Sequence, residues 1–167
     1  MDFTWRNKKK QYVILAPMAN ITTFPFRSII KEAGADIVFT PMISSNAILY
    51  NEEKTLKIAL YKEFEQPVIV QLFGYDGEII VQAAKIVSRS LKPAGIDINM
   101  GCPAPKITGN ESGSALLKNY SRSLEIIKKV REGYKGQLSV KLRLGWEKKD
   151  VLPFVKKLEG IDRKSVV

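Results

Sequence analysis

The sequence GIDINMGCPAP, Gly95–Pro105, combines a short apolar strand with an abrupt and chemically distinctive end. Its first half has the apolar character of a buried strand, and the strand pattern then breaks at Gly101 and Pro103. Glycine permits a sharp turn and proline restricts the backbone, so the residue between them, Cys102, should point in one direction. Parallel α/β barrels carry their chemistry just beyond the carboxyl ends of their strands, where Cys102 is expected. Taken alone, a free cysteine is more often a small buried hydrophobic residue, so the rest of the chain must decide.

The composition indicates a folded domain with a basic surface. The chain has 167 residues, of which 45% are hydrophobic and 26% charged, as in soluble globular proteins. It contains 27 Lys and Arg against 17 Asp and Glu, a formal net charge of +10. This excess suggests a polyanionic partner, with nucleic acid as the first candidate. A generally basic, solvated surface explains the charge about equally well, because the basic residues are spread along the chain.

Several other classes of protein are disfavoured. No apolar run approaches the roughly 20 residues that span a bilayer, and the basic lead over residues 1–11 lacks the apolar core of a signal peptide. A single cysteine forms no internal disulfide, so we expect a reducing cytoplasm. The chain has no histidine, the commonest metal ligand and general base, and we expect no metal site.

Strand and helix patterns alternate along the chain, which predicts a parallel sheet with right-handed crossovers. The expected strands are 12–16, 36–40, 67–73, 95–99 and 137–142. The expected helices run from Thr22 or Thr23 to Gly34, over 44–50, over 52–61, from Asp76 to Val87, over 121–132 with Ser121 as its cap, and from Asp150 onward, with 106–113 as a loop and 114–117 as a helical turn.

Two architectures fit such an α/β sheet, namely an open doubly wound sheet and a (β/α)₈ TIM barrel. No GxGxxG motif follows the first strand, so the dinucleotide fingerprint is absent. A complete barrel needs eight strands and about 250 residues, so we predict an incomplete TIM barrel, about the first five β/α units, over residues 12–161. Polar or chemically special residues at the carboxyl ends of the strands favour the barrel: Met18, Met42, Gln71, Cys102 and Lys141.

The last six residues, 162–167, continue no barrel pattern. They can be encoded by GATCGGAAGAGCGTCGTG, which matches a widely used sequencing adapter. We therefore expect these residues to be a non-native tail that replaces the remainder of the barrel.

Five sequence blocks, in this order and at this spacing, resemble the tRNA-dihydrouridine synthases, flavin enzymes that use NADPH to reduce selected uridines in tRNA. The resemblance covers roughly residues 12–159. The pairing of APMA near the start with NMGCP about 80 residues later is its most specific feature, because other FMN barrels such as dihydroorotate dehydrogenases lack this pair. The blocks are LAPMANITTFPFR (15–27), GADIVFTPMIS (34–44), VQLFG (70–74), DINMGCP (97–103) and VKLRLGW (140–146).

The resemblance implies FMN as the cofactor and NADPH as the reductant. Pro17, Met18 and Ala19 would line the flavin ring, and Gln71 would bond its polar edge. Lys141 would lie near the N1–C2=O region, where negative charge collects in reduced flavin. On the residues alone, Gln71 could equally be a satisfied polar residue of a barrel core, and Lys141 a surface residue.

The resemblance also gives Cys102 the role of acid. Saturating the C5–C6 bond of uracil needs a hydride at C6, which reduced FMN can deliver, and a proton at C5 from the opposite side of the base. A free thiol is mostly protonated at neutral pH and can donate this proton. Asn99 would bond the uracil edge, Arg143 would contact tRNA phosphate, and the target uridine would leave its stack to reach the barrel.

In the family, loops after the later strands hold the FMN phosphate, and a carboxyl-terminal helical domain grips tRNA. We therefore expect the full-length protein to be a cytoplasmic monomer that acts on tRNA. We expect this chain to be inactive by itself, since open sheet edges favour aggregation. Two alternatives remain open: a different FMN barrel that reduces a small pyrimidine or enone, and a non-catalytic RNA-binding module.

Overall fold

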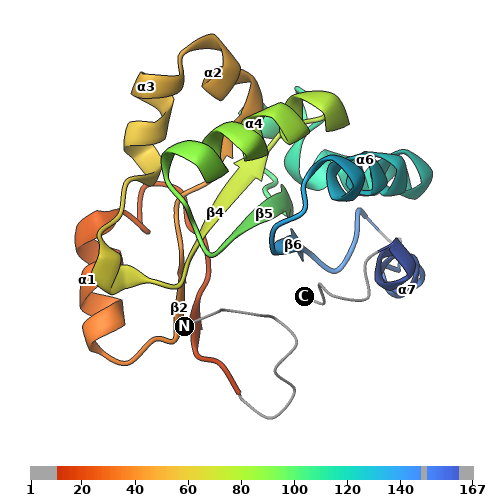
Figure 1. The fold of residues 1–167 in the computed structure, drawn as a ribbon. Coiled ribbons are helices and arrows are strands. Elements are labelled where there is room, and N and C mark those ends of the chain that lie inside the picture. Colours follow the sequence, from red (N-terminus) through yellow and green to blue (C-terminus); the bar gives the residue numbers. More distant parts are fainter. Residues whose placement is uncertain (1–10, 148–149, 162–167) are drawn as a thin grey trace.

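The computed structural model describes residues 11–147 and 150–161 (Figure 1). Most of the predicted basic lead, residues 1–10, and the predicted tail, residues 162–167, lie outside the described residues. The strands are β1 (Ile14–Leu15), β2 (Ile37–Phe39), β3 (Ile43–Ser44), β4 (Val68–Phe73), β5 (Gly95–Met100) and β6 (Leu138–Leu142). The α-helices are α1 (Phe24–Glu32), α2 (Ser45–Tyr50), α3 (Glu52–Leu56), α4 (Gly77–Ser90), α5 (Pro105–Thr108), α6 (Tyr120–Gly133) and α7 (Leu152–Ile161), and the 3₁₀ helices are η1 (Lys57–Ala59), η2 (Glu63–Glu65) and η3 (Gly113–Lys118).

The strands form one parallel sheet whose spatial order follows the chain. The order is β1-β2-β4-β5-β6, and the short β3 pairs with the end of β4. A doubly wound sheet reverses its strand order at a switch point, and this sheet has no reversal among the described strands. The fold is therefore the first part of a (β/α)₈ barrel, as the sequence predicts.

The two faces of the sheet differ in chemistry because strand side chains alternate between them. The even-numbered residues of β2, β4, β5 and β6 pack beneath the helices, and Figure 1 shows α4 and α6 lying along this side. The odd-numbered residues belong to the other face, the barrel interior. That face is apolar in the register layers of Ile37, Phe39 and Ile69. It is polar in the layers that follow toward the carboxyl ends of β4, β5 and β6, with Gln71, Asp97, Asn99, Ser139 and Lys141.

Most predicted elements are present with ends shifted by up to three residues, and the short β3 was not predicted. Three further differences have a visible cause. The helix predicted over 52–61 ends at Leu56, continues as η1 and becomes extended at Leu60, whose carbonyl oxygen is held by a distant side chain. The predicted loop 106–113 opens with α5, because Pro105 suits the first turn of a helix. The cap of α6 is Asn119 rather than the predicted Ser121, and its side chain accepts the Arg122 N–H at 3.1 Å.

A buried ion pair joins α1 to the segment that precedes β4. Arg27 and Glu65 are both 0% exposed, and Arg27 Nε donates to Glu65 Oε2 at 2.8 Å. The two remaining guanidinium nitrogens donate to the carbonyl oxygens of Thr22 and Leu60, each at 2.7 Å. Glu65 Oε1 accepts the backbone N–H of Lys62 at 2.8 Å. Each charged group therefore has several partners, as a buried charge requires.

Removing one partner of this pair should destabilise the fold strongly. We expect Glu65→Gln to lower the free energy of unfolding by about 3 to 5 kcal/mol, since it leaves the Arg27 guanidinium buried without its counter-charge. Urea unfolding followed by circular dichroism measures the change. The control is Glu53→Gln, which breaks the exposed pair with Lys57 and should cost less than about 1 kcal/mol. Equal losses in the two variants would contradict the structural role of the buried pair.

Candidate active site at the strand ends

A chain of buried polar side chains crosses the interior face of β4, β5 and β6. Ser139 Oγ donates to Asp97 Oδ1 at 2.6 Å, and Gln71 Nε2 donates to Asp97 Oδ2 at 2.7 Å. Asn99 Nδ2 donates to Gln71 Oε1 at 2.9 Å and contacts Met42 Sδ, beyond the end of β2, at 3.4 Å. The strand register makes this possible, because it pairs Gln71 with Asp97 and Asp97 with Ser139. We call these five residues the strand-end network.

The strand-end network anchors the loop that carries the cysteine. Asn99 Oδ1 accepts the backbone N–H groups of Gly101 and Cys102, each at 3.0 Å. Cys102 is a free, partly exposed cysteine, and its carbonyl oxygen accepts the Ser114 N–H at 2.9 Å. The residue is therefore not closed off from solvent, while its backbone is held from two directions.

Gly113 makes close packing around Cys102 possible. Its backbone has φ +62°, and a Cβ atom there would lie 2.7 Å from the Cys102 carbonyl oxygen and 2.8 Å from Ile107 Cγ2. Glycine is the residue that accepts both a positive φ and such an approach. Gly113 therefore fixes the distance between η3 and the cysteine loop.

Two basic residues lie at the end of β6. Lys141 is partly exposed and is paired in register with Asn99, whereas Arg143 is exposed beyond the strand. Burial raises the pKa of Asp97 to about 6, against the opposing influence of hydrogen bonds from Ser139 and Gln71 and of the Lys141 charge. The interior face therefore holds a carboxyl group that is easily protonated, with an ammonium group close enough to affect it.

The segment Pro17–Ala19, which follows β1 and which we call the β1 ledge, is held by a different set of contacts. The Met18 side chain is 36% exposed, and its backbone is clamped by Thr22. Thr22 Oγ1 donates to the Met18 carbonyl oxygen at 3.0 Å and accepts the Met18 N–H at 3.1 Å. Because Arg27 holds the Thr22 carbonyl, the buried ion pair supports the β1 ledge.

The structure brings some of the predicted site residues together and leaves others apart. Gln71 and Asn99 belong to the strand-end network. Cys102 is bonded to it through its backbone N–H, and Lys141 is paired in register with Asn99. The β1 ledge and Arg143 lie outside this network. Sequence reasoning missed Asp97, Ser139, Thr22 and Arg27 as supports of the site. A carboxylate inside an otherwise apolar strand was the one available signal, since such a charge needs partners.

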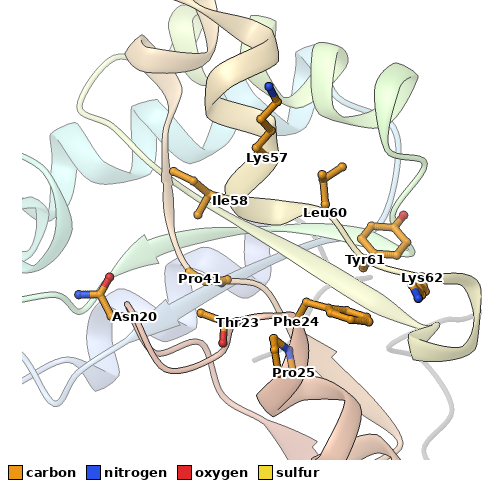
Figure 2. Close-up of a pocket in the computed structure, with 10 residues that line it drawn as sticks. All are labelled: Asn20, Thr23, Phe24, Pro25, Pro41, Lys57, Ile58, Leu60, Tyr61 and Lys62. Carbon is orange, nitrogen blue, oxygen red and sulfur yellow. The ribbon is translucent and has the colours of Figure 1, made fainter.

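A pocket of about 680 Å³ lies next to the β1 ledge and contains none of the predicted site residues (Figure 2). Its lining comes from the loop after β1, the start of α1, the residue that follows Thr40, and the segment between α3 and η2. The lining residues are Asn20, Thr23, Phe24, Pro25, Pro41, Lys57, Ile58, Leu60, Tyr61 and Lys62.

Residues 11–147 and 150–161 contain neither a candidate metal cluster nor a candidate membrane span. Within that part of the chain, no group of three or more His, Cys, Asp or Glu side chains is placed to hold a metal ion. No helix there is long and apolar enough to cross a membrane.

The fold and the strand-end network define a class, that of (β/α) barrels with polar residues gathered at the carboxyl ends of their strands. A sequence profile of the family described as "Dihydrouridine synthase (Dus)" matches residues 14–163, and the chain belongs to this family.

Curated relatives agree with this assignment. The chain is 38% identical over 150 residues to a "Probable tRNA-dihydrouridine synthase" of Helicobacter pylori strain J99, an alignment that covers 89% of this chain and 44% of the relative. A protein of the same name from Aquifex aeolicus is 38% identical over 156 residues, covering 92% of this chain and 49% of the relative. The chain thus spans less than half the length of these relatives.

A solved structure supports the fold alone. A candidate dihydrodipicolinate synthetase from Pseudomonas aeruginosa superposes with a TM-score of 0.53 at 15% sequence identity, covering 92% of this chain and 54% of that one.

The Asp97 carboxyl should make stability depend on pH. Its pKa is raised from the ordinary value of 3.8 to about 6, so the folded state binds the proton more tightly than the unfolded state. Stability should therefore fall as pH rises from about 4 to about 6, by at most about 3 kcal/mol from this group. Urea unfolding at several pH values measures this change. Asp97→Asn should remove the part of the stability decrease that comes from this carboxyl, whereas the control Glu125→Gln, at an exposed position, should retain it. Equal pH profiles in the wild type and both variants would contradict the assignment.

Gly113→Ala should disturb the cysteine loop. A methyl group at this position meets backbone at 2.7 Å in a left-handed conformation, so we expect a loss of about 1 to 3 kcal/mol in the free energy of unfolding. We also expect faster labelling of Cys102 by a thiol reagent under native conditions. Gly160→Ala is the control, because a Cβ there meets nothing within 4 Å. Unchanged stability and labelling in Gly113→Ala would refute the tight packing.

Proposed function

We propose that the protein reduces uridine in tRNA to 5,6-dihydrouridine, as an FMN- and NADPH-dependent oxidoreductase. One observation carries this proposal: Cys102 is partly exposed and its backbone is held by Asn99 at the polar end of a barrel sheet, in a chain of the dihydrouridine synthase family. Because the chain spans less than half of its relatives, the activity is proposed for the complete gene product.

The residues at the strand ends fit a flavin ring. The β1 ledge offers the exposed Met18 side chain as apolar surface, and Lys141 offers an ammonium group to a negatively charged ring edge. Gln71 uses one N–H and one lone pair within the strand-end network, which leaves one N–H and one lone pair of its amide. When bound, FMN would supply the hydride for C6 of the base.

Asn99 and Cys102 would act on the uracil side of the site. Cys102 would hold the proton that C5 receives, and the anchored backbone would keep the thiol in place while the proton moves. Asn99 uses both amide hydrogens and both oxygen lone pairs inside the protein. Its contact with Met42 Sδ is the weakest of the four, because a thioether is a poor acceptor. That N–H is the group with which Asn99 would bond the uracil edge.

The remaining proposed contacts concern tRNA. Arg143 is exposed at the end of β6, next in sequence to the strand that carries Lys141, and would contact a phosphate of the bound RNA. The uridine would have to leave its stack to bring C5 and C6 between Cys102 and the cofactor.

Cys102→Ala tests the proposal. The complete gene product should be yellow, oxidise NADPH and form dihydrouridine in an unmodified tRNA transcript. Single-turnover dihydrouridine formation should fall about 10²- to 10⁴-fold in Cys102→Ala, the range for loss of a positioned acid, with unchanged FMN content and tRNA affinity. Cys102→Ser, which keeps a hydroxyl of similar size but poorer acidity, should also be slow.

Other outcomes would replace the proposal. Unchanged dihydrouridine formation in Cys102→Ala would remove this residue as the proton donor. Reduction of a free pyrimidine or enone with none on tRNA would point to a different flavin barrel. A colourless protein that still binds tRNA would indicate a non-catalytic RNA-binding module.

A further inference from the structure

The pocket beside the β1 ledge combines apolar surface with positive charge. Ile58 and Leu60 line it and are 54% and 52% exposed, and the neighbouring Phe64 is 51% exposed. Exposed apolar side chains of this size that gather around one hollow are typical of a binding surface. The lining includes two ammonium groups, from Lys57 and Lys62, and no carboxylate.

The two aromatic side chains of the pocket, Phe24 and Tyr61, are held by contacts with neighbouring residues. Lys62 Nζ lies 5.2 Å from the centre of the Phe24 ring, and Phe24 packs edge-on against Phe64 with ring centres 6.4 Å apart. The Tyr61 hydroxyl donates to the carbonyl oxygen of Leu91. Figure 2 shows the Phe24 and Tyr61 rings on the same side of the pocket as Lys62, with Asn20 at the opposite end.

The buried ion pair holds the two walls of the pocket at a set distance. Arg27 bonds the carbonyl oxygen of Thr22, which directly precedes the lining residue Thr23, and that of Leu60, which lines the pocket from another segment. Glu65, the partner of Arg27, bonds the backbone N–H of Lys62. The pocket is thus preformed, and one of its walls is the same loop whose Thr22 clamps the β1 ledge.

We propose that this pocket binds a nucleotide of the RNA substrate other than the uridine that is reduced. The base would lie against the apolar side chains of Ile58 and Leu60, and Lys57 and Lys62 would contact the flanking phosphates. Asn20 and Thr23 would offer hydrogen bonds to the edge of the base. This inference rests on the proposed function, in which the substrate is tRNA.

The charges around the pocket are compatible with an RNA phosphate. Lys57 Nζ pairs with Glu53 Oε1 at 3.0 Å, but both side chains are well exposed, at 64% and 86%. An exposed pair of this kind contributes little free energy, so a phosphate can replace the carboxylate as the partner of Lys57. The net charge of +10 favours the approach of a polyanion to any basic surface of the chain.

The test measures the affinity of the complete gene product for an unmodified tRNA transcript at several salt concentrations. The variant Lys57→Gln with Lys62→Gln should lose about tenfold in affinity, and its log–log salt slope should become shallower by about 1.4 to 1.8, as two lost phosphate contacts require. Ile58→Glu should weaken binding similarly, because it places a carboxylate against the base. Ile58 is exposed, so this substitution should leave the fold intact.

The control removes two lysines that lie outside the pocket. Lys54→Gln with Lys85→Gln has the same change in charge, at exposed positions of α3 and α4, and should lose less than about threefold. Equal losses in the two double variants would overturn the proposal, as would unchanged tRNA affinity in the variant that lacks Lys57 and Lys62. FMN content is measured in parallel: a protein without flavin contradicts the proposed enzyme, whereas the comparison of lysine variants still tests the pocket.

Discussion

A single carboxylate, that of Asp97, is the group on which the strand ends depend. It is 1% exposed and accepts one hydrogen bond from β4 and one from β6, so it joins the three strands through side chains as well as backbone. A buried carboxylate without partners is costly, and these two donors are the compensation. Because Gln71 is oriented by Asp97 and in turn orients Asn99, the position of the cysteine backbone follows from this group.

A second set of buried charges, Arg27 and Glu65, has a comparable role near α1. Arg27 and Glu65 connect α1, the loop after β1 and the segment before β4, which belong to parts of the chain 38 residues apart. The backbone of the β1 ledge is therefore set by an ion pair and the hydroxyl of Thr22, whereas the cysteine loop is set by amides and a carboxylate. The β1 ledge and the cysteine loop are thus supported by separate buried polar clusters. Because hydrogen bonds are directional, each cluster fixes the orientation of the backbone that it holds.

The sequence predicted five of the six described strands, because their pattern is local, and the barrel follows from their regular alternation with helices. Apolar runs that end at glycine, proline or a polar residue identify the strands, and regular alternation with helices identifies the parallel sheet. Local patterns do not predict the partners of Asp97, because Gln71 and Ser139 lie 26 and 42 residues away in sequence. They contact Asp97 only because of the strand register. The overlong helix prediction at 52–61 has a similar cause, because the carbonyl of Leu60 is claimed by Arg27 from a distant helix.

Position 99 illustrates why packing and chemistry select the same residue. Its side chain gives one N–H to Gln71 and accepts two backbone N–H groups from the cysteine loop. An aspartate would keep the acceptors but would place a carboxylate oxygen against Gln71 Oε1. A leucine would leave two partly buried backbone N–H groups without this acceptor. An amide is therefore required by the fold before any substrate is considered. A base bonded to Asn99 would therefore be positioned relative to Cys102 by the same side chain that positions the cysteine backbone.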